Sequence, residues 1–300
     1  MIYLSTSERY TIPLPEGHAF PMEKYDLVQA QLLHEGVITS SQLQHPELFQ
    51  EADVLTTHCK TYWKKIQTCQ FEPAEIRKIG FPPSEALRDR SLSSASGTLM
   101  AGRNALEYGL GINLAGGTHH AFYHYGEGYC VLNDIAIAIN CLREENKIRK
   151  ALIVDLDVHQ GNGTAALFQK DSAVFTFSMH CKDNYPLRKE QSDLDIDLPA
   201  YTTDDTYLHL LKQELPGLIT RTDPDIIFYQ SGVDVIGGDR LGKLSLTPEG
   251  CKNRDAFVFQ TAKSASIPIV SVMGGGYHTQ LNILVSAHAE TVKQALYYFC

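Results

Sequence analysis

Short apolar segments alternate along the chain with longer stretches whose hydrophobic residues have a helical repeat, and this alternation constrains the fold most. The short segments are rich in β-branched and aromatic residues, and each runs into Gly, Asp, His or Ser. These features predict strands over residues 111–115, 151–156, 173–178, 225–231 and 267–273. Strands that alternate with helices favour a parallel sheet with helices on both faces.

The intervening stretches predict helices over residues 24–34, 97–108, 132–144, 204–219, 247–265 and 281–299. Residues 81–97, rich in Pro and Ser, are expected to form a long surface loop. We therefore expect a three-layer α/β/α fold with a mostly parallel central sheet. A chain of 300 residues that is 43% hydrophobic can bury one large core, and no linker divides it, so residues 1–300 are expected to form a single domain.

Composition argues against several classes of protein. A net charge of -9 disfavours direct binding to nucleic acid. The seven cysteines are odd in number and include no C-x-x-C pair, which disfavours a disulfide framework and a thiolate zinc site. Cys130 and Cys141 are expected to pack as small apolar residues. Since we find neither a signal-peptide pattern nor a long apolar run, we expect a cytoplasmic protein without a membrane span.

Polar residues follow four of the expected strands. They are His119 and His120, then Asp155, Asp157 and His159, then Asp234, and finally Tyr277 behind three glycines. The carboxyl ends of parallel strands meet at one edge of a sheet, and ligands bind there in open α/β folds. The sequence therefore predicts a site at this edge.

The segment from Asp155 to His159 suits a metal ion. Residues two apart in an extended segment point to the same side, so Asp155, Asp157 and His159 can share one face. Taken alone, the pattern fits a helix-capping Asp and a loop His equally well. Asp234 alone fits a turn residue. Together, Asp157, His159 and Asp234 make three protein ligands, and three ligands plus a water are typical of catalytic zinc.

The remaining polar residues suit acid–base chemistry and oxyanion binding. His119 and His120 are adjacent, which disfavours shared ligation of one metal and fits acid–base groups beside it. Tyr277 can donate a hydrogen bond to an oxyanion. The glycines at 274–276 remove side chains where another group comes close, and they predict open space near the site. A surface loop with two His, and a mobile loop with an incidental Tyr, are the alternatives.

In combination these motifs resemble the histone deacetylase superfamily, which has the arginase-deacetylase fold. The resemblance rests on residues 117–120 (GTHH), 128–130 (GYC), 155–163 (DLDVHQGNG), Asp234 and 274–277 (GGGY), which occur in the family's order. Residues 18–22 and 238–242 look most like the class IV deacetylases and their bacterial relatives.

The resemblance implies a zinc-dependent amide hydrolase. Asp157, His159 and Asp234 would hold Zn²⁺, which would polarise the acyl carbonyl and activate a water. His120 or His119 would act as general base, and one of them would then protonate the leaving amine. The other implied contacts are Asp155 accepting from His119, Asn162 accepting from His120, and Tyr277 donating to the oxyanion.

It also implies substrate and cation contacts. The residues expected to line the substrate tunnel or touch substrate are Gly128, Tyr129, Tyr185, Leu241 and Gly275. A monovalent cation, usually K⁺ in the family, would lie against Asp155 and the backbone carbonyls of Asp157, His159, Ser178 and Met179. Glu85 and Asp89 are candidates for an acidic residue that grips the substrate backbone.

The expected substrate is an acyl-lysine in a peptide or protein. The alternatives are an acetylpolyamine or other small amide, and a scaffold that keeps the fold without the activity. Polyamine-specific members carry a Glu seven residues beyond the third metal ligand, and this chain has Leu241 there. The chain also departs from the common pattern in having Asn162 in place of Asp, Tyr129 in place of Phe, and Gln160 in place of a second His. The class IV resemblance implies a preference for long acyl chains.

Overall fold

The predicted three-layer α/β/α fold with a parallel sheet is confirmed in a computed structural model that describes residues 2–300. Eight strands in this range form one sheet in the order β2-β1-β3-β8-β7-β4-β5-β6, and every pairing is parallel. The strands are β1 Leu4–Ser5, β2 Leu43–Gln44, β3 Leu110–Asn113, β4 Ala151–Asp155, β5 Val174–Cys181, β6 Leu194–Leu198, β7 Ile226–Gln230 and β8 Ile269–Val272.

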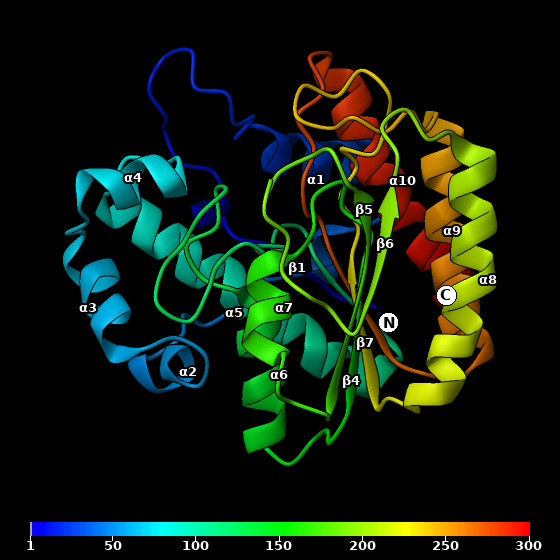
Figure 1. Cartoon of the computed structure of the whole chain (residues 1–300), viewed down its shortest axis with the longest axis horizontal. Helices are drawn as coiled ribbons and strands as arrows, with labels where there is room; N and C mark the ends of the chain where they lie inside the picture. The colour runs from blue at the N-terminus through cyan, green and yellow to red at the C-terminus, as the bar shows by residue number, and fades with distance from the viewer. Residues whose placement is uncertain (1) are drawn as a thin grey trace.

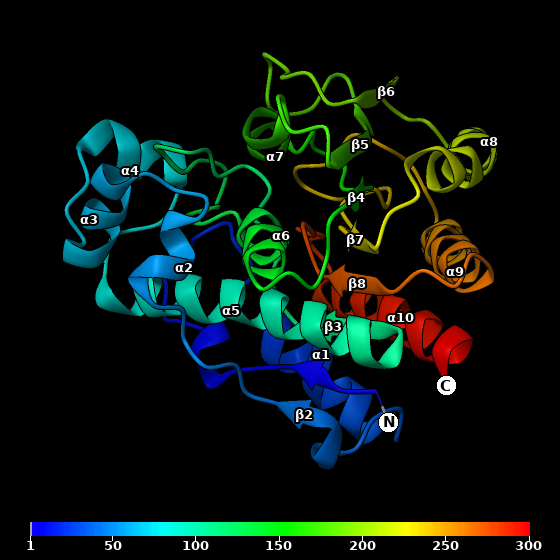
Figure 2. The ribbon, with the colours of Figure 1, turned by 90° about the horizontal axis from the view of Figure 1, so that it is seen from below.

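Helices cover both faces of the sheet, as Figures 1 and 2 show. One layer contains α5 Glu85–Tyr108, α6 Asp134–Glu144 and α7 Asn162–Phe168, with α2 Glu51–Leu55, α3 Lys60–Thr68 and α4 Pro73–Ile79 outside it. The other contains α1 Lys24–His34, α8 Asp204–Thr222, α9 Pro248–Ser264 and α10 Leu281–Phe299. Two 3₁₀ turns, η1 Glu8–Tyr10 and η2 Ser40–Gln42, lie in the N-terminal part. No helix within residues 2–300 has both the length and the apolar character needed to cross a membrane.

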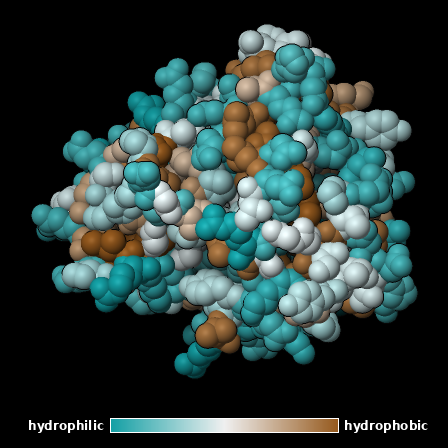
Figure 3. Space-filling view, turned by 90° about the horizontal axis from the view of Figure 1, so that it is seen from above, coloured by the Kyte–Doolittle hydropathy of each residue, from teal (hydrophilic) through white to brown (hydrophobic). Residues whose placement is uncertain are grey.

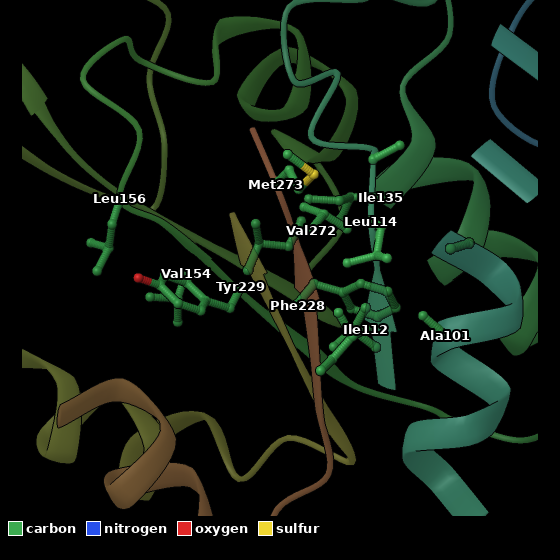
Figure 4. Packing of buried hydrophobic residues seen from close by; sticks show 14 of the residues in the cluster. Ala101, Ile112, Leu114, Ile135, Val154, Leu156, Phe228, Tyr229, Val272 and Met273 are labelled. Atoms are coloured by element: carbon green, nitrogen blue, oxygen red, sulfur yellow. The ribbon is translucent and has the colours of Figure 1, made fainter. Parts of the chain in front are cut away.

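Neighbouring residues of the central strands pack against opposite helix layers. On β7, Phe228 lies against α5 beside Gly102, whereas the Tyr229 hydroxyl on the other face donates to Asp255 of α9 at 2.5 Å. Figure 4 shows Phe228 with Ile112 in this core. A Cβ at Gly111 would collide with the backbone of α5, so this glycine permits the close contact between β3 and α5.

The expectation of a surface loop over residues 81–97 is wrong. Helix α5 begins at Glu85, and the Ser84 hydroxyl caps it by accepting from the Leu87 N–H at 3.1 Å. The serines inside the helix are buried, and two of them bond backward: Ser91 donates to the Leu87 carbonyl and Ser96 to the Leu92 carbonyl, both at 2.7 Å. A run of small polar residues suggested a loop, but here it forms the close-packed face of a helix.

Most other boundaries agree with the sequence, but three strands toward the two edges of the sheet were not predicted. Helices α1 and α10 begin and end as predicted, and the five predicted strands occur with ends shifted by up to a few residues. Strands β1, β2 and β6 were missed. All seven cysteines are free. Cys141 packs in the hydrophobic core as expected, whereas Cys130 is buried but lines the small cavity beside His119 and His120.

Candidate metal and catalytic site

Asp157, His159 and Asp234 converge at the carboxyl edge of the sheet. Asp157 and His159 follow β4, Asp234 follows β7, and these two strands are neighbours. His159 Nδ1 lies 3.1 Å from Asp157 Oδ1 and 3.2 Å from Asp234 Oδ2. All three residues are buried, and one ligand atom from each lies within 4.8 Å of the others. The predicted ligand set is therefore assembled in space.

The donor set fits a divalent cation. Within residues 2–300 the buried Asp234 Oδ2 has no hydrogen-bond partner. Burial, reinforced by the neighbouring Asp157 carboxylate, raises the pKa of Asp234 to about 7. Two carboxylates and an imidazole in one buried cluster match the ligand chemistry of zinc, and a cation there would offset the charge repulsion.

Backbone N–H groups hold both carboxylates in place. Asp157 Oδ2 accepts from the Gly275 N–H at 2.7 Å, and Asp234 Oδ1 accepts from the Val158 N–H at 3.0 Å. A Cβ at Gly275 would overlap the Asp234 carboxylate, and one at Gly276 would press on Leu284. The open space expected beside this loop is limited to a cavity of about 30 Å³, because the metal ligands and the core fill most of the room left by the missing side chains.

His119 and His120 each have their own partner. His119 Nδ1 lies 2.7 Å from Asp155 Oδ2, and His120 Nδ1 lies 2.6 Å from Asn162 Oδ1. The two imidazole centroids are 4.1 Å apart, and both residues are 4% exposed. The hydrogen bonds implied by the resemblance are therefore present.

Glu127 fixes the orientation of Asn162. The Asn162 Nδ2 group donates to Glu127 Oε1 at 2.7 Å, so the amide oxygen must face His120. The second Glu127 oxygen pairs with Lys78 Nζ at 2.8 Å. Glu127 itself is buried. Sequence reasoning missed this residue, since its role depends on a contact between segments 35 residues apart.

The two histidines have opposite pKa shifts. Burial opposes protonation of His119, but the carboxylates of Asp155 and Asp157 outweigh it and raise the pKa. Burial, with the nearby His119 and His159, lowers the pKa of His120 well below its usual value. The amide of Asn162 offers no charge to reverse this effect.

Tyr277 is held beside the metal cluster by Asp239. The Tyr277 N–H donates to Asp239 Oδ2 at 2.7 Å, and the Leu241 N–H donates to Asp239 Oδ1 at 2.8 Å. Burial, with the Asp234 and Asp157 carboxylates, raises the pKa of Tyr277 well above its usual value. The phenol therefore stays protonated and able to donate.

Asp134 organises the loop that carries the two histidines. Its carboxylate accepts from the Gly117 N–H at 2.9 Å and from the Thr118 N–H at 2.7 Å. The sequence analysis missed both Asp134 and Asp239. The hint for Asp134 was an acidic residue at the start of a predicted helix, and Asp239 lay in the 238–242 segment that resembles the class IV deacetylases, although no role was assigned to it.

Four of the predicted substrate residues line one pocket. Gly128, Tyr129, Tyr185 and Leu241 surround an opening of about 710 Å³ that also reaches His120, His159 and Tyr277. Gly275 lies apart from this opening, in a smaller cavity of about 30 Å³ beside the metal cluster. Figure 3 looks onto the carboxyl edge, where apolar residues are interspersed among hydrophilic ones.

The remaining predicted contacts are less complete. The β4–β5 register sets Ser178 beside Asp155, and Met179 is the next residue of β5, so the residues expected to bind K⁺ are neighbours. Glu85 and Asp89 lie on α5 and are not among the residues that line the pocket, so a contact of either with the substrate backbone stays a prediction.

Comparisons with known proteins agree with this geometry. A family model described as a histone deacetylase domain matches residues 18–293. An uncharacterized protein from Picosynechococcus is 44% identical over 93% of both chains. Histone deacetylase 2 of Arabidopsis thaliana is 28% identical over 92% of this chain and 74% of its own. The crystal structure of the HDA15 HD domain superposes with a TM-score of 0.81 at 18% identity, and covers 98% of this chain and 90% of that one. The chain belongs to the histone deacetylase family.

Proposed function

We propose that this chain is a zinc-dependent hydrolase that cleaves the amide bond of N-acyl-lysine in peptides or proteins, with residues 1–300 acting as one catalytic domain. The observation that carries the proposal is the buried cluster of Asp157, His159 and Asp234, of which His159 lines a pocket that His120 and Tyr277 also line. A zinc ion held by these ligands polarises a carbonyl and lowers the pKa of a water molecule.

His120 is assigned the role of general base. Its Nδ1–H donates to the Asn162 oxygen, which leaves Nε2 as the acceptor for a proton from the attacking water. The water oxygen bonds to the acyl carbon while that proton moves to His120. The assignment follows from which ring nitrogen the amide partner occupies.

His119 is assigned the role of general acid, and Tyr277 that of oxyanion donor. The Asp155 carboxylate stabilises a protonated His119, which supplies a proton to the amine nitrogen as the C–N bond breaks. The proton held on His120 is then released to solvent or returned to His119. The Tyr277 phenol donates to the oxyanion of the tetrahedral intermediate.

K⁺ is proposed as a second, structural cation. Asp155 and the backbone carbonyls of Asp157, His159, Ser178 and Met179 would hold it, and it would brace the strand end that carries two metal ligands. The support is the β4–β5 register, which makes Asp155 and Ser178 neighbours.

Acyl-lysine is favoured over acetylpolyamine because of Leu241. This side chain lines the pocket and is 37% exposed, so a second ammonium of a polyamine beside it would meet an apolar wall, whereas Asp183 is the one carboxylate among the lining residues in the described range. A lysine stem, in contrast, gains apolar contact there.

The test compares zinc-loaded wild type and Leu241→Glu on an acetyl-lysine peptide and on acetylspermidine. We expect the wild type to have the higher kcat/KM on the peptide, and the variant to shift toward the polyamine. A wild-type preference for acetylspermidine would reject acyl-lysine as the substrate, and no hydrolysis of either would reject the proposed reaction.

A further inference from the structure

The entrance of the substrate pocket is rich in cationic side chains. Four basic residues line it, and Asp183 is the one acidic residue among its lining side chains in the described range. The four are Arg77 and Lys78 on α4, and Arg240 and Lys243 on the segment between β7 and α9. The whole chain has a net charge of -9, so the local charge is opposite to that of the molecule.

Two of these cations are already engaged. Lys78 Nζ pairs with buried Glu127 at 2.8 Å, and Lys243 Nζ donates to the Asp183 backbone carbonyl at 2.7 Å. Lys78 therefore holds the Glu127 carboxylate that orients Asn162, and this carboxylate offsets its charge. Lys243 keeps its charge, because a carbonyl offsets none of it.

Arg77 and Arg240 have no such partner. Both are exposed, and neither has a carboxylate within 4.0 Å among residues 2–300. Nothing in the packing requires a guanidinium at either place. They come from two segments far apart in sequence, and both border the opening that leads to His120. Two unpaired guanidinium groups are suited to binding carboxylates in a bidentate manner.

An acyl-lysine inserted in this pocket would leave its flanking residues at the entrance. Tyr129 and Tyr185 line the pocket between the surface and His120, so the lysine stem passes them while the peptide backbone stays outside. Neighbouring side chains of the substrate are then within the field of Arg77, Arg240 and Lys243. Acidic neighbours gain attraction there, and basic ones are repelled.

We propose that this entrance selects acyl-lysine in an acidic sequence context, so that the preferred substrate is a peptide segment with Asp or Glu beside the modified lysine. The inference rests on the proposed acyl-lysine hydrolysis and adds the chemistry of the flanking residues. The same cations oppose the approach of a polycationic substrate.

The experiment uses three acetyl-lysine peptides of one length that differ in their flanking residues, which are Glu, Gln or Lys. We expect kcat/KM to fall in the order Glu, Gln, Lys at low salt, and the differences to shrink at high salt. Arg77→Gln and Arg240→Gln should each reduce the Glu-over-Gln ratio about 1.5- to fivefold, the range of an exposed ion pair.

The matched control is Arg149→Gln, which removes the same charge from an exposed residue just before β4, at the opposite end of that strand from the site. It should leave the ratio unchanged. An equal loss in this variant would mean that overall charge sets the preference, and would overturn the inference.

Binding of the same peptides, labelled with fluorescein and followed by anisotropy, separates the inference from the proposed reaction. Equal affinity for the Glu- and Gln-flanked peptides, or equal kcat/KM on them, would overturn the acidic preference whatever the turnover. Preferential binding of the Glu-flanked peptide without hydrolysis would support the acidic preference of the entrance and would reject the proposed reaction.

Discussion

His119 and His120 are neighbours in sequence and equally buried, yet the fold gives them different partners. His119 faces Asp155, a carboxylate at the end of β4, whereas His120 faces Asn162, an amide at the start of α7. A carboxylate stabilises an imidazolium, and a neutral amide does so far less. The protonation behaviour of each histidine is therefore set by its hydrogen-bond partner at Nδ1.

The two partners also differ in what they require of their surroundings. Either oxygen of the Asp155 carboxylate can accept a hydrogen bond, so its orientation is not critical. Asn162 accepts through one side of its amide, and a flipped amide would present N–H groups to His120. The contact with Glu127 prevents that flip, so the His120–Asn162 pair depends on one more buried residue than the His119–Asp155 pair does.

The largest expected effect comes from removing each histidine in turn. His120→Ala should lower kcat by about 10³, within the range for general acid–base catalysis, and His119→Ala by at least tenfold less. Single-turnover assays on an acetyl-lysine peptide, with zinc content measured in both variants, check the difference. Equal losses, or a greater loss in His119→Ala at full zinc content, would contradict the predicted ranking of the two histidines.

Tyr277→Phe should have the next largest effect on kcat. It should leave the His119–Asp155 and His120–Asn162 hydrogen bonds intact. Loss of one oxyanion donor typically lowers kcat by about 10²–10³. Zinc content and KM should change little, because Asp239 holds this segment through the Tyr277 backbone N–H. A change in KM alone would show that Tyr277 positions substrate without stabilising the oxyanion.

Glu127→Ala should have the smallest effect on kcat, and this effect should act only through the His120–Asn162 pair. We expect kcat to fall about tenfold, because Asn162 loses the bond that fixes its amide. Adding Asn162→Asp should restore much of the loss, since a carboxylate needs no fixed orientation. The matched control is Glu145→Ala, which breaks an ion pair with Arg103 away from the site. No rescue by Asn162→Asp would mean that Glu127 acts through packing alone.

The metal ligands were predictable because their positions follow from local rules. Asp157 and His159 follow directly after β4, in a bend and not in the extended segment that their spacing predicted, and the carboxyl end of β7 brings Asp234 beside them. The order of motifs then gave the partners of His119 and His120 through the family resemblance. Motif spacing, strand direction and the family resemblance together predicted this part of the site.

The supporting residues were not predictable in the same way. Asp134, Asp239 and Glu127 act through hydrogen bonds to segments that the sequence does not place beside them. Helix α5 was partly missed because it buries several serines, two of which, Ser91 and Ser96, bond to its own carbonyls, and the sequence alone does not reveal those hydrogen bonds. Strands β1 and β2 have two residues each, too few to form a periodic pattern.

The most direct test of the account measures zinc and turnover together in wild type and Asp234→Ala. Asp205→Ala, which changes an exposed acid in the first turn of α8, is the matched control. We predict that wild type and control bind zinc and hydrolyse an acetyl-lysine peptide, and that Asp234→Ala loses both properties while it stays folded by circular dichroism. Turnover near that of wild type in a sample verified to be free of metal would contradict the account.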